Sequence, residues 1–139
     1  MTKRRCCHRV VTAIPYPNGK MKNTINWFEI PSENFDRAVT FYGTILQATL
    51  RKETVGDTPN AILPYEGDAV GGAIIHSPRT KPSANGVLPY LNCDGVIAEV
   101  LARVPTAGGS IIMPCATFPF GQIAIIQDTE GNHIGLHSN

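Results

Sequence analysis

Apolar and polar residues follow two periods along this chain, and the order of the two periods is repeated once. Residues 25–31 alternate with a period of two, which is typical of a strand with one buried face. Apolar positions in residues 34–46 then recur at helical spacing. Asn34 is a candidate N-cap, and Asp36 falls in the first turn, where a carboxylate is favourable. The pattern predicts a strand, a turn and an amphipathic helix.

The alternation within the opening strand assigns its side chains to two faces. Asn26, Phe28 and Ile30 share one face, which we expect to pack under the helix. Trp27 and Glu29 share the other face and point away from it. That second face is therefore the first place to look for a function.

The remaining pattern gives the same order of elements twice. In the first half, a loop is predicted at 54–59 and strands at 48–52, 60–64 and 71–76. In the second half, strands are predicted at 87–92, 110–113, 122–127 and 133–137. A second helix is expected after the candidate cap Asp94, ending at Gly108-Gly109 and disturbed by Pro105. Both halves therefore read βαβββ.

A short echo supports an internal duplication. Residues 72–77 read Gly-Ala-Ile-Ile-His-Ser, and residues 133–138 read His-Ile-Gly-Leu-His-Ser. Each segment closes its half with an alternating strand that ends in His-Ser. On this alignment Ile74 corresponds to Gly135.

Length and composition indicate one domain with an ordinary core. The 139 residues carry a formal charge of +1, which gives no electrostatic reason to expect nucleic acid or an anionic membrane as a partner. No apolar run approaches the roughly 18 residues of a membrane span. The four cysteines include an adjacent pair but no Cys-x-x-Cys spacing, so a cytoplasmic, reducing setting is the simplest expectation.

The first twenty residues differ from the rest of the chain. They carry Lys3-Arg4-Arg5 and a turn-rich stretch at 15–19, and the regular pattern begins only after Met21. Either Met21 is a start and residues 1–20 are an extension, or they form an arm that packs on a neighbour. We expect a single domain at 21–139, with module one at 24–77, a linker at 78–86 and module two at 87–138.

Three motifs in this frame resemble the vicinal oxygen chelate superfamily, which includes glyoxalase I, bleomycin-resistance proteins and extradiol dioxygenases. They are Phe-Glu-Ile-Pro at 28–31 running into Phe-Asp-Arg-Ala-Val-Thr-Phe-Tyr at 35–42, Leu-Ala-Arg-Val at 101–104 with Ala-Gly-Gly at 107–109, and Asp-Thr-Glu-Gly-Asn-His-Ile-Gly-Leu at 128–136. The resemblance implies an α+β fold in which two βαβββ modules form a curled mixed sheet around a cavity. It also implies a homodimer.

The resemblance places the family's metal ligands at positions that lack them here. Metal-dependent members bind a divalent cation through His, Gln or Glu at equivalent strand positions of both modules. Those positions fall at Trp27, within 87–90, at Gly135 and at its first-half echo Ile74. A metal site needs about three protein ligands, so we expect no metal and no other cofactor.

The faces that would line the cavity supply the candidate site. The candidate ligand-binding residues are Trp27, Glu29, His76, Tyr90, Asn92, Phe118, Phe120 and His137. Trp27 either packs in the core or stacks on a ligand, and Glu29 either pairs with an arginine such as Arg79 or orients a ligand or acts as a base. The two phenylalanines, predicted in a loop at 118–121, would cover a pocket mouth or lie in a dimer interface.

These observations predict a small-molecule binding protein of the glyoxalase/bleomycin-resistance kind. It would hold a cationic or aromatic organic molecule in a cavity without the usual metal. The alternative is a glyoxalase-like lyase or isomerase, or a dioxygenase-type enzyme. That enzyme would use a metal relocated to His76, His137 and Glu29, or use Glu29 as a metal-free base.

Overall fold

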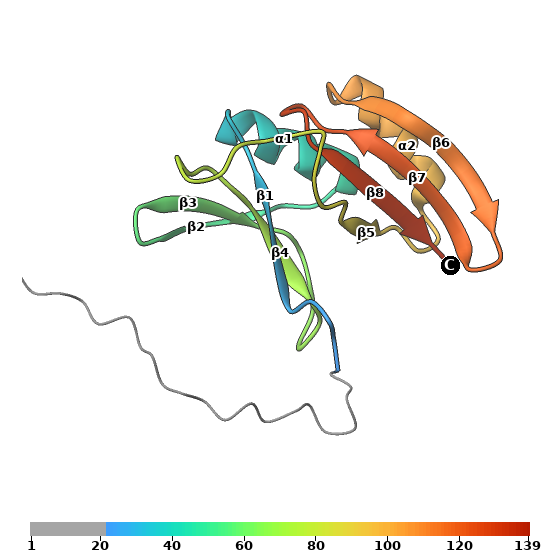
Figure 1. Ribbon diagram of the computed structural model, residues 1–139, viewed down its shortest axis with the longest axis horizontal. Helices are drawn as coiled ribbons and strands as arrows, with labels where there is room; N and C mark the ends of the chain where they lie inside the picture. The colour runs from blue at the N-terminus through green and yellow to red at the C-terminus, as the bar shows by residue number, and fades with distance from the viewer. Residues whose placement is uncertain (1–21) are drawn as a thin grey trace, which may run out of the picture.

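The computed structural model describes residues 22–139 and contains two βαβββ modules (Figure 1). The first comprises β1 (Trp27–Pro31), α1 (Phe35–Leu46), β2 (Arg51–Val55), β3 (Thr58–Ile62) and β4 (Gly71–Ile75). The second comprises β5 (Tyr90–Asn92), α2 (Ile97–Thr106), β6 (Ser110–Phe118), β7 (Gly121–Gln127) and β8 (His133–Ser138). The predicted α+β class and the repeated order of elements are confirmed. The predicted extension at residues 1–20 and the expected start at Met21 lie outside the described residues.

Each module forms its own four-stranded mixed sheet. Sheet A has the order β1-β4-β3-β2, and sheet B has the order β5-β8-β7-β6. In each sheet the first and last strands of the module pair in parallel, and the other pairs are antiparallel. The two sheets do not close into a barrel.

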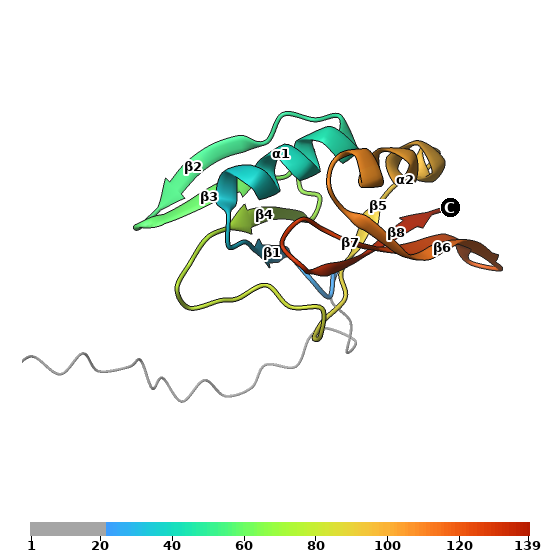
Figure 2. The ribbon, with the colours of Figure 1, turned by 90° about the horizontal axis from the view of Figure 1, so that it is seen from above.

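Both helices cover the same side of the molecule, so each sheet has a helix face and a helix-free face (Figure 2). The core lies between the helices and the sheets. Its largest fully buried side chains include Phe41 and Ile45 of α1, Val100 of α2 and Leu136 of β8. Ile30 is buried in this core and Phe28 packs against it, which confirms the predicted inward face of β1.

The two helices begin in different ways. Asn34 caps α1, because its side-chain oxygen accepts a hydrogen bond from the backbone N–H of Arg37 at 3.1 Å. The predicted cap Asp94 of α2 is wrong. Val96 holds the N-cap position without a side-chain cap, and an Asp94 carboxylate oxygen instead accepts from the backbone N–H of Asn139 at 2.8 Å. The helix also continues past Pro105 to Thr106.

Several predicted loops and strands need correction, among them the second strand, which spans 51–55 and not 48–52. The segment 54–59 is a tight β2–β3 hairpin, in which Val55 pairs with Thr58 around Gly56 at a φ of 64°. The segment 118–121 is likewise the β6–β7 hairpin, with Phe118 opposite Gly121. Strand β5 is only three residues long, in place of the six expected at 87–92.

The echo between the two halves is offset by one residue in the structure. The backbone N–H of Ser32 donates to the carbonyl of Ile75, and the N–H of Cys93 donates to the carbonyl of His137 in the matching place. His137 therefore corresponds to Ile75, and Gly135 corresponds to Ala73. The repeated His-Ser dipeptides do not occupy equivalent positions.

A buried polar network joins the turn before β8 to module one. Asp128 accepts hydrogen bonds from the Tyr42 hydroxyl at 2.6 Å and from the Asn132 side-chain amide at 2.9 Å. The Asn132 amide also donates to the carbonyl of Pro31 at 2.8 Å and its oxygen accepts from the N–H of Ser83 at 3.1 Å. Burial, followed by the charge of Asp128, raises the pKa of Tyr42 well above its usual value.

Glu130 makes a second connection from the same turn. Its carboxylate accepts from the backbone N–H groups of Glu33 and Asn34 and pairs with Arg37 Nε at 2.8 Å. The carboxylate therefore lies at the N-terminus of α1, where a negative charge is stabilised. Burial raises its pKa, but the hydrogen bonds from Arg37, Asn34 and Thr129 outweigh burial, and the net pKa is lowered. These contacts fix the position of one module on the other.

Among residues 22–139, neither helix has the length and apolar character that crossing a membrane requires.

Candidate functional site

The predicted site residues lie on the helix-free faces of two different sheets. Trp27 and Glu29 line a groove of about 330 Å³ on sheet A, together with Asn60 and Arg79. Trp27 is 39% exposed and meets Tyr65 edge-on at 6.1 Å between ring centroids, so of the two alternatives the one that packs it in the core is wrong. Its indole face is available to a ligand.

The Glu29 side chain is exposed and makes no ion pair or side-chain hydrogen bond with any residue from 22 to 139. The alternative in which Glu29 pairs with Arg79 is therefore not seen in the described part of the chain. The floor of the groove is a small cluster of buried Ile62, Ala73 and Ile75. The linker residues Ser77, Arg79 and Thr80 border it, and Figure 2 shows the linker crossing this side of the sheet.

His76 does not join the other candidates. Ile74, which shares its face by alternation, is fully buried in the main core beneath the helices. The assumption that this face lines a cavity is wrong. His76 follows β4 as an exposed residue, and its Nδ1 lies 2.8 Å from the carbonyl oxygen of Ser32. This contact is a strand-end hydrogen bond.

Four predicted residues gather on the helix-free face of sheet B and form what we call the aromatic shelf: Tyr90, His137, Phe120 and Phe118. The Phe118 and Phe120 rings are stacked, with centroids 5.4 Å apart and planes 4° apart. The His137 ring stacks on Phe120 at 6.5 Å and 20°, and its Nε2 lies 3.2 Å from the Phe120 carbonyl oxygen. Three nearly parallel rings therefore follow the end of the β6–β7 hairpin.

Tyr90 is held on this face by a glycine. A Cβ added to Gly135 would lie 2.4–2.7 Å from the Tyr90 ring atoms, so the ring covers the Gly135 backbone closely. Tyr90 pairs with Gly135 across the parallel β5–β8 ladder, which sets the two residues side by side. Gly135 is thus required for the ring position, and Tyr90 remains 47% exposed.

A polar rim borders the shelf. Tyr90, Asn92, Asp94, Phe120 and His137 line a shallow pocket of about 590 Å³ with Leu91, Ile123 and Asn139. The Asn92 side-chain oxygen accepts from the backbone N–H of Asp94 at 2.9 Å, which orients the amide. The Asp94 carboxylate lies at the edge and is exposed. The pocket therefore offers flat apolar surface beside a negative charge.

The arrangement of possible ligand side chains does not suit the metal site that the resemblance implies. Among residues 22–139, no three His, Cys, Asp or Glu side chains gather where they could hold a metal ion. The relocated site of the enzymatic alternative, with Glu29, His76 and His137, is not assembled within residues 22–139. At Gly135, the Tyr90 ring fills the space into which a ligating side chain would project.

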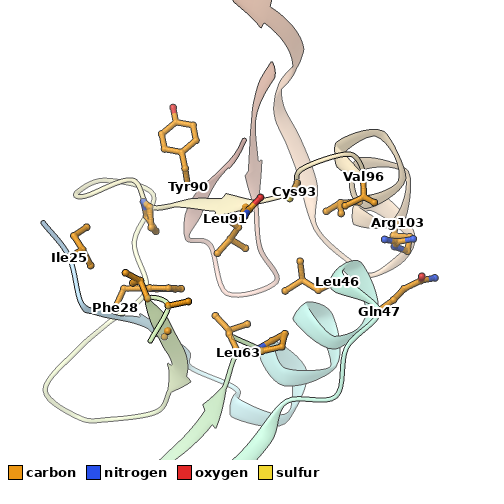
Figure 3. Close-up of a pocket in the computed structure, with 18 residues that line it drawn as sticks. Ile25, Phe28, Leu46, Gln47, Leu63, Tyr90, Leu91, Cys93, Val96 and Arg103 are labelled. Atoms are coloured by element: carbon orange, nitrogen blue, oxygen red, sulfur yellow. The ribbon is translucent and has the colours of Figure 1, made fainter. Parts of the chain in front are cut away.

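A larger cavity, which we call the intermodule cleft, lies between the modules on the helix side. It measures about 790 Å³ and is lined mainly by apolar side chains, as Figure 3 shows. Leu46, Leu63 and Leu91 lie around its middle, and Tyr90 points away from it. Strand β5 therefore separates the intermodule cleft from the aromatic shelf.

The intermodule cleft and its arginine were missed by reasoning from the sequence. Arg103 was visible only as part of a helical motif, and its place depends on how α2 packs beside α1. Phe118 and Phe120 were predicted because exposed aromatic side chains in a loop before a strand can cover a pocket mouth or lie in a dimer interface. Cys93, which lines the intermodule cleft, is buried, and burial raises the pKa of its thiol to about 11. It is therefore an unreactive neutral thiol near pH 7.

Comparisons with known proteins agree with this fold. A glyoxalase/bleomycin resistance protein from Albidiferax ferrireducens is 13% identical, with a TM-score of 0.68 over 84% of this chain and 99% of that one. A glyoxalase-related enzyme from Fulvimarina pelagi is 14% identical, with a TM-score of 0.63 over 86% and 89%. A glyoxalase I variant from Zea mays is 19% identical at a TM-score of 0.59, and its alignment covers 81% of this chain and 44% of that one.

No curated protein matches the sequence. The family model of the Glyoxalase/Bleomycin resistance protein/Dioxygenase superfamily matches residues 24–136. This range includes both modules and the linker between them. The vicinal oxygen chelate fold expected from the three motifs is confirmed, and the chain belongs to the glyoxalase/bleomycin resistance protein/dioxygenase superfamily.

Proposed function

We propose that this protein binds a small, flat organic molecule, cationic or aromatic, on the aromatic shelf without a metal. The observation that carries the proposal is the nearly parallel alignment of the Phe118, Phe120 and His137 rings. Phe120 is 62% exposed, so its ring has an accessible surface. A planar ligand would extend this stack.

The charge around the aromatic shelf favours a cation over an anion. Asp94 is the charged side chain of the pocket, and its carboxylate lies at the rim. A ligand cation over an aromatic face gains roughly 0.5–1 kcal/mol at an exposed site and more when water is excluded. Stacking of the ligand's flat apolar part on the rings adds to this gain.

A homodimer would complete the site. Trp27 and Glu29 lie on the helix-free face of sheet A, whereas the aromatic shelf lies on sheet B. Both faces expose aromatic rings that a second copy could cover. If the sheet A groove of one copy faced the shelf of the other, Trp27 would cover the ligand and Glu29 would add a second carboxylate.

Isothermal titration with 1-methylquinolinium, a flat cation, tests the proposal against neutral quinoline as the matched ligand. We expect tighter binding of the cation, about tenfold weaker binding by Phe120→Ala or Tyr90→Ala, and a smaller loss with Asp94→Asn. Ile112→Ala removes an exposed side chain of the same sheet away from the pocket and serves as control. Equal binding by all four variants and the parent would contradict the proposal.

Metal content separates binding from the enzymatic alternative. Protein purified without chelators is expected to carry less than stoichiometric nickel, zinc, iron or manganese. It should also bind 1-methylquinolinium equally well before and after chelation. Stoichiometric metal, lost together with ligand binding on chelation, would favour a metal enzyme whose site is assembled between two copies.

A further inference from the structure

The intermodule cleft combines an apolar interior with a single charged side chain. Of the 18 residues between 22 and 139 that line it, Arg103 alone is charged. Gln47 lies beside Arg103 at one end, and Ile25 and Phe28 lie at the other end (Figure 3). The volume of about 790 Å³ falls within the range of roughly 300–1,000 Å³ that is usual for small-molecule sites.

Arg103 is held in place without an acidic partner. Its Nε donates to the backbone carbonyl of Ile45 at 2.9 Å, near the C-terminus of α1. Arg103 is half-buried as a residue, and no carboxylate within residues 22–139 pairs with its guanidinium. Burying a cation in apolar surroundings is costly unless an anion or hydrogen-bond acceptors compensate for the lost water. A planar guanidinium fixed through one nitrogen still offers its terminal N–H groups to a carboxylate.

We propose that the intermodule cleft binds an amphipathic monocarboxylate, with the carboxylate on Arg103 and an alkyl chain along the apolar walls. The chain would contact Leu46, Leu63 and Leu91 and reach toward Phe28. This site takes the opposite charge from the aromatic shelf and lies on the other side of β5. It does not depend on the function proposed above.

The arrangement of the two ends sets the class of ligand. With the carboxylate at the Arg103 end, an apolar tail would cross the intermodule cleft toward Phe28 and Ile25. At that end no charged side chain from the described part of the chain lines the wall. A dianion with a second carboxylate at that end would bury an uncompensated charge. A compact anion without a tail would leave the apolar walls uncovered. A medium-chain alkyl carboxylate places its charge at Arg103 and its apolar tail along the apolar walls, and so matches both ends of the cleft.

Isothermal titration with octanoate and with octanamide, its neutral match, tests the proposal on the full chain. We expect octanoate to bind at least tenfold more tightly than octanamide, since a hydrogen bond between two charged groups is stronger than one to a neutral amide. Arg103→Gln should abolish this preference and Arg103→Lys should retain part of it. Arg51→Gln, the same change on exposed β2, should leave both affinities unchanged.

A variant that fills part of the intermodule cleft tests where the ligand binds, independently of the charge on Arg103. Val96 lines the intermodule cleft and is exposed at the N-cap of α2, so Val96→Trp fills the space without disturbing the core. Val96→Trp should weaken octanoate and octanamide alike, and Phe120→Ala should weaken neither. Unchanged octanoate binding in both Val96→Trp and Arg103→Gln would overturn this inference. If 1-methylquinolinium fails to bind the aromatic shelf, the proposal of a carboxylate site in the intermodule cleft is unaffected, because the two sites are separate.

Discussion

The hydroxyl of Tyr42 donates a hydrogen bond to Oδ2 of Asp128 at 2.6 Å, although 86 residues separate the two in sequence. Tyr42 closes the buried face of α1 in module one, and Asp128 opens the turn before β8 in module two. Both side chains are buried. The contact therefore holds the two modules together, and the intermodule cleft lies between them.

Replacing Tyr42 by phenylalanine should weaken this connection. The variant keeps the ring but leaves Asp128 Oδ2 with one partner fewer in a buried place. We expect the free energy of unfolding in urea to fall by about 1–3 kcal/mol. Tyr65→Phe, which removes an exposed hydroxyl, is the matched control and should change stability by less than about 0.5 kcal/mol. Equal effects of the two substitutions would contradict the role of the hydrogen bond.

Glu130 should make the free energy of unfolding depend on pH in the acid range. Its folded-state pKa is lowered, so its contribution is present above the unfolded pKa of about 4.3 and is lost as pH falls through the folded pKa. Glu130→Gln should therefore cost about 1–3 kcal/mol near pH 7, and the gap from the parent should shrink toward about pH 3. Urea unfolding at several pH values measures this gap.

Glu33 provides the control for that experiment. Its exposed carboxylate pairs with Lys81 at 3.3 Å, and such surface pairs contribute only about 0–1 kcal/mol. Glu33→Gln should show a small, nearly flat difference from the parent across the same pH range. A gap for Glu130→Gln that stays constant into acid would show that the charge of the carboxylate is unimportant.

Gly135 should control ligand binding through Tyr90. An alanine Cβ at this position would fall within 2.7 Å of the ring, so Gly135→Ala should displace Tyr90 and disturb the aromatic shelf. We expect about tenfold weaker binding of 1-methylquinolinium by titration, similar to Tyr90→Ala, because a stacked ring contributes on the order of 1 kcal/mol. Gly131→Ala has no atom within 4 Å of its Cβ and a φ of +95°, so it should cost stability alone.

The role of Glu29 distinguishes a binding protein from a metal-free enzyme. In the proposed dimer, Glu29 of one copy only orients the ligand bound to the aromatic shelf of the other copy. Glu29→Gln should then weaken 1-methylquinolinium binding by less than tenfold. Trp27→Ala should lower the same affinity. Turnover of an α-ketoaldehyde or a similar substrate that disappears with Glu29→Gln would instead support the enzymatic alternative.

Local patterns predicted the elements whose signal is contained in a few neighbouring residues. Asn34 is a residue type that favours the N-cap position, and it caps α1 as predicted. The spacing of apolar residues through Phe41 and Ile45 matches the buried face of the same helix. Strand β2 was misplaced because all five of its side chains are exposed and no apolar alternation marks it. The His-Ser echo misled the alignment of the halves because it compares letters, whereas the register depends on backbone pairing.

The candidate site was predicted in parts and not as an assembly. Phe118, Phe120 and His137 were named, but their stacking depends on the hairpin turn and on pairing between β7 and β8. Ile74 and His76 were placed on the wrong face because the alignment of the halves was offset. The contact of Glu130 with α1 was unforeseen, because a charged residue in a turn is usually solvated and no local pattern indicates a partner 93 residues away.

The most direct test of the proposed function is a two-dimensional amide NMR titration of the protein with 1-methylquinolinium. The account predicts saturable shifts that centre on Tyr90, Phe120 and His137 and disappear in Phe120→Ala. Shifts confined to the intermodule cleft around Leu63 and Val100, or the absence of saturable shifts, would contradict it.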